Sequence, residues 1–139
     1  VFSTYAIDKK RKLAVFGDES GSLKLIDIKT GKKIKELKGF NKDKTLSVDL
    51  QKNLAINGSS DMRIGIYALD GTLKTSLKVK FLPYGTTLSP DNTKFAAQYD
   101  EKNNIAIYSI YGKLTDMLKG HTMALNGIKF LNKNTIISY

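Results

Sequence analysis

Hydrophobic residues occur along this chain in short runs that alternate with polar residues, and turn-forming residues separate the runs. The clearest example is residues 46–50, Leu-Ser-Val-Asp-Leu, in which every second side chain is apolar. A period of two places one row of side chains on a buried face, so this pattern predicts a β-strand. The sequence predicts strands at 2–7, 13–16, 23–28, 33–38, 46–50, 54–57, 64–69, 72–78, 86–88, 95–99, 105–110, 113–119, 126–131 and 135–138.

The predicted strands repeat with a nearly constant period. One strand of each unit begins at Leu23, Ile64 and Ile105, which are 41 residues apart. The strand before it begins at residues 13, 54, 95 and 135, and these positions are 41, 41 and 40 residues apart. A period in this range is typical of solenoids and propellers, in which each repeat buries its faces only against its neighbours.

Glycine-containing corners follow the third strand of each unit, at Gly31, Gly71 and Gly112. Glycine supplies the positive φ that a tight hairpin turn requires. Each unit therefore holds four short strands, and we expect an all-β chain of antiparallel sheets. The fourth strands carry several lysines, which are typical of an unpaired sheet edge. The expected units are 1–38, 39–79, 80–119 and an incomplete 120–139.

The composition limits the chemistry that the chain can perform. It has no cysteine and one histidine, which excludes disulfides, thiolate chemistry and a histidine-built metal site. No run approaches the roughly 18 apolar residues of a membrane span, and no signal peptide is visible. Because the chain begins at Val1 rather than methionine, that absence does not decide the compartment. A cytoplasmic location is favoured over a periplasmic one.

The formal net charge of +10 directs attention to polyanions, because a basic surface releases counterions from a phosphate backbone. Arg11 and Arg63 are the only arginines, however, and readers of bases and phosphates tend to use the guanidinium fork. The lysine-bearing edge strands account for much of the charge. Nucleic acid is therefore a disfavoured partner.

Three landmarks stand at fixed places in the units. Gly120-His121 precedes the first strand of its unit, and Ile26-Asp27 ends a third strand. Tyr67 and Tyr108 occupy the place of Ile26 in their own units. This arrangement resembles the WD40 repeat, which has Gly-His before its first strand and Trp-Asp at the end of its third. The resemblance covers essentially the whole chain and implies an incomplete WD40-like β-propeller of about three and a half four-stranded blades.

The resemblance also implies a buried hydrogen-bond network on each blade, to which a turn aspartate contributes. Asp61 keeps that aspartate, with Ser59 two residues before it, whereas Ser20 and Lys102 take its place in the other units. Gly39-Phe40 replaces Gly-His in the second unit. We therefore expect an incomplete network and a greater contribution from core packing. The structural residues implied are Ser59, Asp61, Tyr67, Tyr108, Gly120 and His121.

Three and a half units leave a propeller ring open, because propellers close with typically four to eight blades. We expect either that the chain is part of a longer protein or that a second copy supplies the rest. The first is favoured because the chain stops within the second strand of its fourth unit. Without either, each end would expose an apolar face larger than the few hundred Å² that mark interaction sites. Self-association or further blades are therefore expected.

The candidate chemical groups are few. His121 has no partner in a triad-like signature, and the resemblance assigns it a structural hydrogen bond. Asp18-Glu19 and Asp100-Glu101 lie 82 residues apart, twice the period, so we interpret them as turn formers rather than as an acid/base pair. No calcium loop or glycine-rich phosphate loop is present. We predict no catalytic, cofactor-binding or metal-binding residue, and the chain is not expected to be an enzyme.

The blade arrangement sorts the connections onto two rims of opposite character. One rim should be strongly positive, with Lys9, Lys10, Arg11, Lys12, Lys29, Lys32, Lys33, Lys52, Lys94, Lys113 and Lys133. The other rim should be near neutral or mildly acidic. In the family, this rim and the central opening commonly bind protein partners. The residues on it that we expect to contact a partner are Phe40, Met62, Tyr84 and Met123.

Three functions fit these expectations. The favoured one is a non-catalytic propeller scaffold that mediates protein–protein interaction. An alternative is a binder of nucleic acid or of another anionic surface through the basic rim, for which added salt should steeply lower the affinity. A second alternative is an accessory propeller for an exported bacterial redox enzyme.

Overall fold

The computed structural model describes residues 2–139, which form three four-stranded antiparallel sheets followed by a hairpin. Strand order in each sheet follows chain order. Blade 1 holds β1 (Phe2–Asp8), β2 (Leu13–Asp18), β3 (Leu23–Asp27) and β4 (Lys33–Leu37). Blade 2 holds β5 (Thr45–Gln51), β6 (Leu54–Ser59), β7 (Arg63–Ala68) and β8 (Leu73–Lys78). Blade 3 holds β9 (Thr86–Leu88), β10 (Lys94–Gln98), β11 (Ile105–Ser109) and β12 (Leu114–Leu118), and the hairpin holds β13 (Ile128–Asn132) and β14 (Thr135–Ser138).

The predicted all-β class and the four-stranded units are confirmed, and the local cause of each turn is visible. Gly31, Gly71 and Gly112 have φ values of 72°, 99° and 92°, as the hairpin corners after the third strands require. The pairing of third and fourth strands is irregular at one equivalent place in every blade, next to Ile26, Tyr67 and Tyr108. The lysine-bearing fourth strands are the outer edges of their sheets, as expected.

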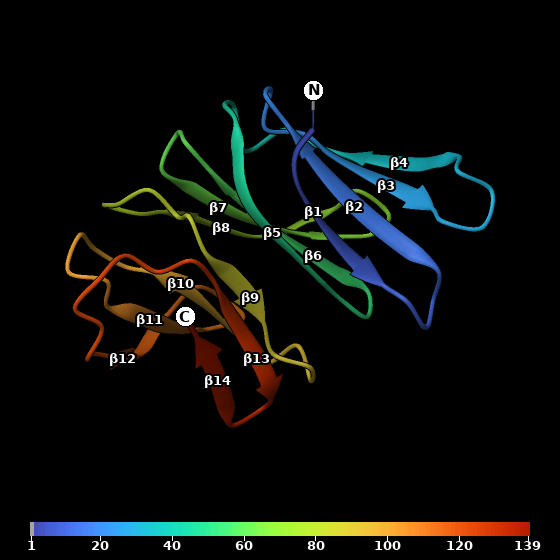
Figure 1. The fold of residues 1–139 in the computed structure, drawn as a ribbon. Helices are drawn as coiled ribbons and strands as arrows, with labels where there is room; N and C mark the ends of the chain where they lie inside the picture. Colours follow the sequence, from blue (N-terminus) through green and yellow to red (C-terminus); the bar gives the residue numbers. More distant parts are fainter. Residues whose placement is uncertain (1) are drawn as a thin grey trace.

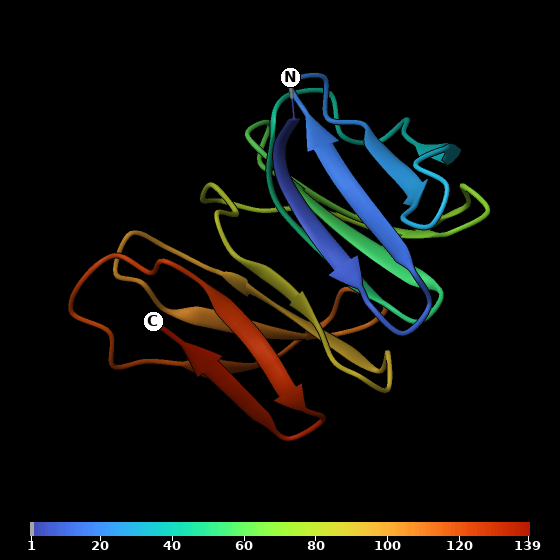
Figure 2. The ribbon, with the colours of Figure 1, turned by 45° about the vertical axis from the view of Figure 1, so that its right-hand side comes forward.

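The sheets are arranged as an open arc around their first strands. Innermost strand β1 lies beside β5, β5 beside β9, and β9 beside β13. Figure 1 shows the blades following one another along the arc, and Figure 2 shows the first strands of blade 1 and of the hairpin running in the same direction. The sheets do not close on one another among the described residues, so the ring is incomplete.

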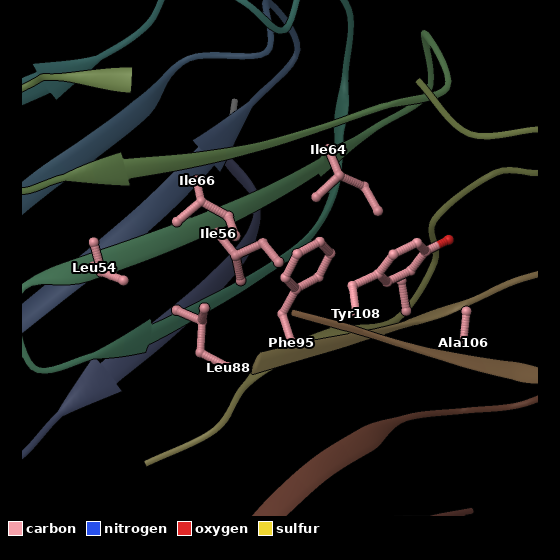
Figure 3. Packing of buried hydrophobic residues seen from close by; sticks show 9 residues of the cluster. Leu54, Ile56, Ile64, Ile66, Leu88, Phe95, Ala106 and Tyr108 are labelled. Atoms are coloured by element: carbon pink, nitrogen blue, oxygen red, sulfur yellow. The ribbon is translucent and has the colours of Figure 1, made fainter. Parts of the chain in front are cut away.

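A separate apolar cluster fills each interface between neighbouring sheets. Val15, Leu23 and Leu25 of blade 1 pack against Leu50 and Tyr67 of blade 2. The interface of blades 2 and 3 is the largest cluster, and Figure 3 shows its side chains meeting between the two sheets. Its buried members are Leu54, Ile56, Ile64, Ile66, Leu88, Phe95, Ala97, Ala106 and Tyr108. Ile128 and Phe130 attach the hairpin to blade 3 through Ala96, Ile105 and Ile107.

One part of the predicted repeat is wrong by a single residue. Tyr67 pairs with Ala55 in blade 2, whereas Tyr108 pairs with Phe95 in blade 3. The counterpart of Ala55 is therefore Phe95, 40 residues later rather than the predicted 41. Because side chains alternate along a strand, this slip turns Phe95 toward blade 2, where it is fully buried.

Both ends of the arc expose apolar side chains. Ala6 packs toward blade 2, so its neighbours Tyr5 and Ile7 point to the open face of blade 1, where they are 64% and 48% exposed. In the hairpin, Leu131 and Ile137 are 56% and 45% exposed. The sequence-based expectation of apolar surface at both ends therefore agrees with the structure.

Gly21 provides a direct test of how the first two blades meet. Its φ is 83°, and a Cβ there would lie 2.6 Å from the carbonyl oxygen of Asp43 and 2.9 Å from the carbonyl carbon of Asn41. We expect Gly21→Ala to lower the free energy of unfolding by about 2 kcal/mol, through backbone strain and crowding. Gly31→Ala is the matched control, because Gly31 has a φ of 72° but nothing within 4 Å of a Cβ. Urea unfolding measures both, and equal losses would contradict the packing of this turn on the 38–44 loop.

Candidate functional site

The connections between strands lie on two rims of the arc (Figure 2). Successive strands are antiparallel, so the turns after odd-numbered strands share one rim and all other connections share the opposite one. The basic rim comprises the turns 9–12, 28–32, 52–53, 69–72, 89–93, 110–113 and 133–134. The loop rim comprises the segments 19–22, 38–44, 60–62, 79–85, 99–104 and 119–127.

Tyr67, buried near the end of β7, organises a polar cluster on the loop rim of blade 2. Its hydroxyl donates a hydrogen bond to Oδ1 of Asn41 at 3.1 Å and accepts one from the N–H of Phe40 at 3.4 Å. The side-chain amide of Asn41 donates to the carbonyl of Arg63 at 3.0 Å. Burial raises the pKa of Tyr67, so its hydroxyl keeps its proton at neutral pH. Sequence reasoning missed Asn41, whose only signal is its place directly after Gly39-Phe40.

Ser59 and Asp61 attach the turn between β6 and β7 to the 38–44 loop. The hydroxyl of Ser59 donates to the carbonyl of Asp43 at 2.7 Å and accepts from the N–H of Asp61 at 3.3 Å. Oδ2 of Asp61 accepts from the N–H of Lys42 at 2.7 Å. Oδ1 of Asp61 is buried and has no hydrogen-bond partner among the described residues. Phe40, in the place of the expected histidine, has no side-chain hydrogen bond to offer it.

Phe40 differs from the other three predicted contact residues because its side chain is partly buried against blades 1 and 2. The ring packs against the apolar cluster of blades 1 and 2, and the guanidinium carbon of Arg63 lies 5.3 Å from the ring centre. Nη1 of Arg63 also donates to the carbonyl of Phe40 at 3.0 Å. A cation over the ring and a hydrogen bond to the backbone together hold this loop against blade 2.

Met62, Tyr84 and Met123 extend from the loop rim into solvent. Their exposed fractions are 42%, 54% and 79%, respectively. Each comes from a different loop-rim segment: 60–62, 79–85 or 119–127. The structure therefore places three of the four predicted contact residues on one rim with accessible side chains, and Phe40 on the same rim in a half-buried state.

His121 contacts Ser138 rather than any acidic group. Its Nε2 lies 2.6 Å from the hydroxyl oxygen of Ser138 on β14. A serine–histidine pair at this distance has the geometry of a nucleophile and its base, but such a pair requires a group that orients the imidazole. No carboxylate contacts His121 among the side chains that the structure describes. The bond ties the 119–127 segment to β14, and Gly120, with a φ of 138°, precedes it.

Tyr108 shares the position of Tyr67 in its blade but makes different contacts. Its ring stacks on Phe95, with centroids 4.9 Å apart and planes 13° from parallel. Burial raises the pKa of Tyr108. Tyr108 therefore belongs to the apolar interface of blades 2 and 3, whereas Tyr67 joins a polar cluster.

Asp49 connects three innermost strands, and sequence reasoning missed it. Its Oδ2 accepts from the hydroxyl of Thr87 at 2.9 Å and from the N–H of Leu88 at 2.8 Å, both on β9. Its Oδ1 lies 2.6 Å from Nζ of Lys129 on β13. Thr87 in turn accepts from the N–H of Phe130 at 3.1 Å. Period-two alternation puts Asp49 on the polar face of residues 46–50, but β5 has a blade on each side and this carboxylate is buried.

Asp18 and Asp100 serve the turns between second and third strands, as the sequence predicted. Oδ1 of Asp18 accepts from the N–H groups of Ser20 and Ser22 at 2.8 and 3.2 Å. Oδ1 of Asp100 accepts from those of Lys102 and Asn104, both at 3.1 Å. Each carboxylate therefore stabilises its own turn, which leaves neither in the geometry of an acid/base pair.

The turn at Asp18 should contribute stability that acid removes. Burial alone would raise the pKa of Asp18, but hydrogen bonds from Lys24 and Ser20 outweigh it and lower the pKa to about 2. A folded-state pKa below the unfolded value of 3.8 gives stability that is present above that value and is lost as the pH falls toward 2. We expect the wild type to lose ~1 kcal/mol across this window that Asp18→Asn does not lose. Urea unfolding at a series of pH values measures this, and identical profiles would contradict it.

In the described part of the chain, no group of three or more His, Cys, Asp or Glu side chains is placed to hold a metal ion. Residues 2–139 contain no helix with the length and apolarity to cross a membrane.

No protein-family model matches the sequence, and no curated protein matches it significantly.

Proposed function

We propose that the chain is a non-catalytic, WD40-like β-propeller scaffold that binds another protein through its loop rim. The observation that carries this proposal is the exposure of Met62, Tyr84 and Met123 on three segments of one rim. Large apolar side chains on a polar rim provide the anchors that protein interfaces use, and methionine and tyrosine suit this role well.

Contacts at the loop rim support the WD40-like assignment. Ser59, Asp61 and Tyr67 come from the second strand, the following turn and the third strand, and all three contact the 38–44 loop. His121, from the Gly-His pair, hydrogen-bonds Ser138 of the second strand of its own unit. The resemblance implies contacts of this kind between the same elements. The unpartnered Oδ1 of Asp61 agrees with the expected incomplete network.

The surroundings of the polar groups support a binding role over a catalytic one. His121 has Ser138 as its hydrogen-bond partner and no orienting carboxylate among the described side chains. A hollow of about 370 Å³ on the basic rim is lined by Lys52, Pro90, Asp91, Leu131, Asn132 and Lys133. Its one carboxylate, Asp91, accepts hydrogen bonds from Ser89 and Thr93 of its own turn. Neither place combines a nucleophile, a base and a group that orients the base.

Site-specific photo-crosslinking in cells tests the proposal. A benzophenone amino acid is placed at residue 62, 84 or 123, with residue 111 as the matched control, because Tyr111 is 88% exposed on the basic rim. We expect one protein to be crosslinked from all three loop-rim positions and not from residue 111. No common crosslinked protein, or the same protein captured equally at residue 111, would contradict a loop-rim interface.

A further inference from the structure

Two basic turns of blade 1 lie side by side and form a single surface. The N–H of Ile28 donates to the carbonyl of Lys12 at 2.9 Å, which joins the turn after β1 to the turn after β3. We call this surface the basic end of blade 1. Its seven cationic residues are all exposed: Lys9, Lys10, Arg11, Lys12, Lys29, Lys32 and Lys33.

Few negative charges oppose this surface. Asp8 and Asp27 flank the two turns, and each carboxylate accepts hydrogen bonds from backbone N–H groups of its own turn. Arg11 lies 3.9 Å from Asp8, and Lys33 lies 3.8 Å from Glu36. The other five cations, Lys9, Lys10, Lys12, Lys29 and Lys32, form no ion pair with any side chain that the structure describes. The basic end therefore has a strong positive potential of its own.

The fold does not require this charge. The equivalent turns of blade 2, residues 52–53 and 69–72, have one lysine, Lys52, and one aspartate, Asp70. The turn after β1 is also two residues longer than the turn after β5. In each blade, the turn after the first strand has one residue at positive φ: Lys12 at 59° in blade 1, Lys52 at 51° in blade 2 and Asn92 at 56° in blade 3. The turns therefore share a backbone feature, and the dense cluster of lysines is particular to blade 1.

We propose that the basic end of blade 1 binds the headgroups of anionic phospholipids at a membrane surface. Lysines near a bilayer are attracted by its negative surface potential, and exposed aliphatic side chains beside them enter the interface. Ile28 lies within one basic turn and is 43% exposed, and Ile34 follows Lys33 and is 52% exposed.

A surface that binds nucleic acid would be expected to use arginine forks or stacking aromatic rings. The two turns contain one arginine and no aromatic residue. This surface is on the opposite rim from the proposed protein interface, so either assignment stands or fails without the other.

Sedimentation with vesicles measures this binding. The probes are vesicles of phosphatidylcholine alone and vesicles of equal parts phosphatidylcholine and phosphatidylserine. We expect the 139-residue chain to bind only the anionic vesicles, with an affinity that falls as salt is added. The variant Lys9→Gln/Lys10→Gln/Lys29→Gln should bind roughly 100-fold more weakly, because each lysine near the surface contributes roughly fivefold.

A charge-matched control and a polyanion control make the result decisive. Lys42→Gln/Lys80→Gln/Lys102→Gln removes the same charge from exposed positions on the loop rim and should bind within a few-fold of the wild type. Ile28→Ser should weaken vesicle binding severalfold and leave binding to a DNA duplex unchanged. Unchanged urea midpoints show that these surface variants remain folded. Equal losses in the two lysine variants, equal binding to both vesicles, or binding to DNA without binding to vesicles would each overturn the proposal.

Discussion

Replacing Phe95 with alanine is expected to lower the free energy of unfolding by about 4 kcal/mol. The Phe95 ring is fully buried between blades 2 and 3, where it stacks on Tyr108 and lies beside Ile56 in the apolar cluster (Figure 3). Its removal leaves a cavity that β-sheets on both sides prevent from collapsing. Urea unfolding followed by circular dichroism measures the loss.

The control for Phe95→Ala is an aromatic residue on the open face of blade 1. Tyr5 is 64% exposed and its ring lies 6.0 Å from that of Phe16. We expect Tyr5→Ala to lower the free energy of unfolding by less than about 1 kcal/mol, because little cavity forms at an exposed site. Comparable losses in the two variants would contradict the burial of Phe95 between blades 2 and 3.

Asp49→Ala should lower the free energy of unfolding by about 3 kcal/mol. The carboxylate accepts from Thr87, Leu88 and Lys129, and hydrogen bonds to a charged group stabilise by about 1.5–3 kcal/mol each. Its loss leaves the N–H of Leu88 buried without its acceptor. Because these partners belong to β9 and β13, the variant should also increase hydrogen exchange in the hairpin.

Lys129→Met separates the ion pair from the buried hydrogen bonds. The side chain of Lys129 is 48% exposed, so its pair with Asp49 is screened by water and should contribute less than about 1 kcal/mol. The hydrogen bonds from Thr87 and Leu88 remain in this variant. A loss equal to that of Asp49→Ala would show that the ion pair, rather than the buried hydrogen bonds, connects the innermost strands.

The strands and the four-stranded units were predictable because their signals are local. Alternation over residues 46–50 and glycine at the corner after each third strand depend on a few adjacent residues, and the φ values of Gly31, Gly71 and Gly112 follow from them. The outer position of the lysine-bearing fourth strands was predictable for the same reason. Most of the fold could therefore be predicted from patterns among residues that are close together in the sequence.

The missed features depend on contacts between blades. A single-residue change of register moved Phe95 to the opposite face, and no local signal in residues 94–98 marks that change. The burial of Asp49 was missed because the pattern of one strand does not reveal that sheets lie on both sides of it. Asn41 became a partner of Tyr67 only through the path of the 38–44 loop. The roles of such residues become clear only from the packing of the blades against one another.

Engineered cysteines can show whether the blades stack around their first strands. The natural chain has no cysteine, so only an introduced pair can form a disulfide. The hydroxyl oxygens of Ser47 on β5 and Thr86 on β9 lie 3.0 Å apart, although the residues are 39 apart in sequence. We predict that Ser47→Cys/Thr86→Cys oxidises to an intramolecular disulfide in the folded chain.

The comparison is a pair at opposite edges of one sheet. Ser47→Cys/Ser76→Cys joins β5 to β8, which are separated by β6 and β7, or about 14 Å at the usual strand spacing. This distance exceeds the about 7 Å between Cα atoms that a disulfide spans. Mass spectrometry under native conditions should find the disulfide in the first variant and free thiols in the second. Free thiols in the first variant, or a disulfide in the second, would contradict the stacking of the blades.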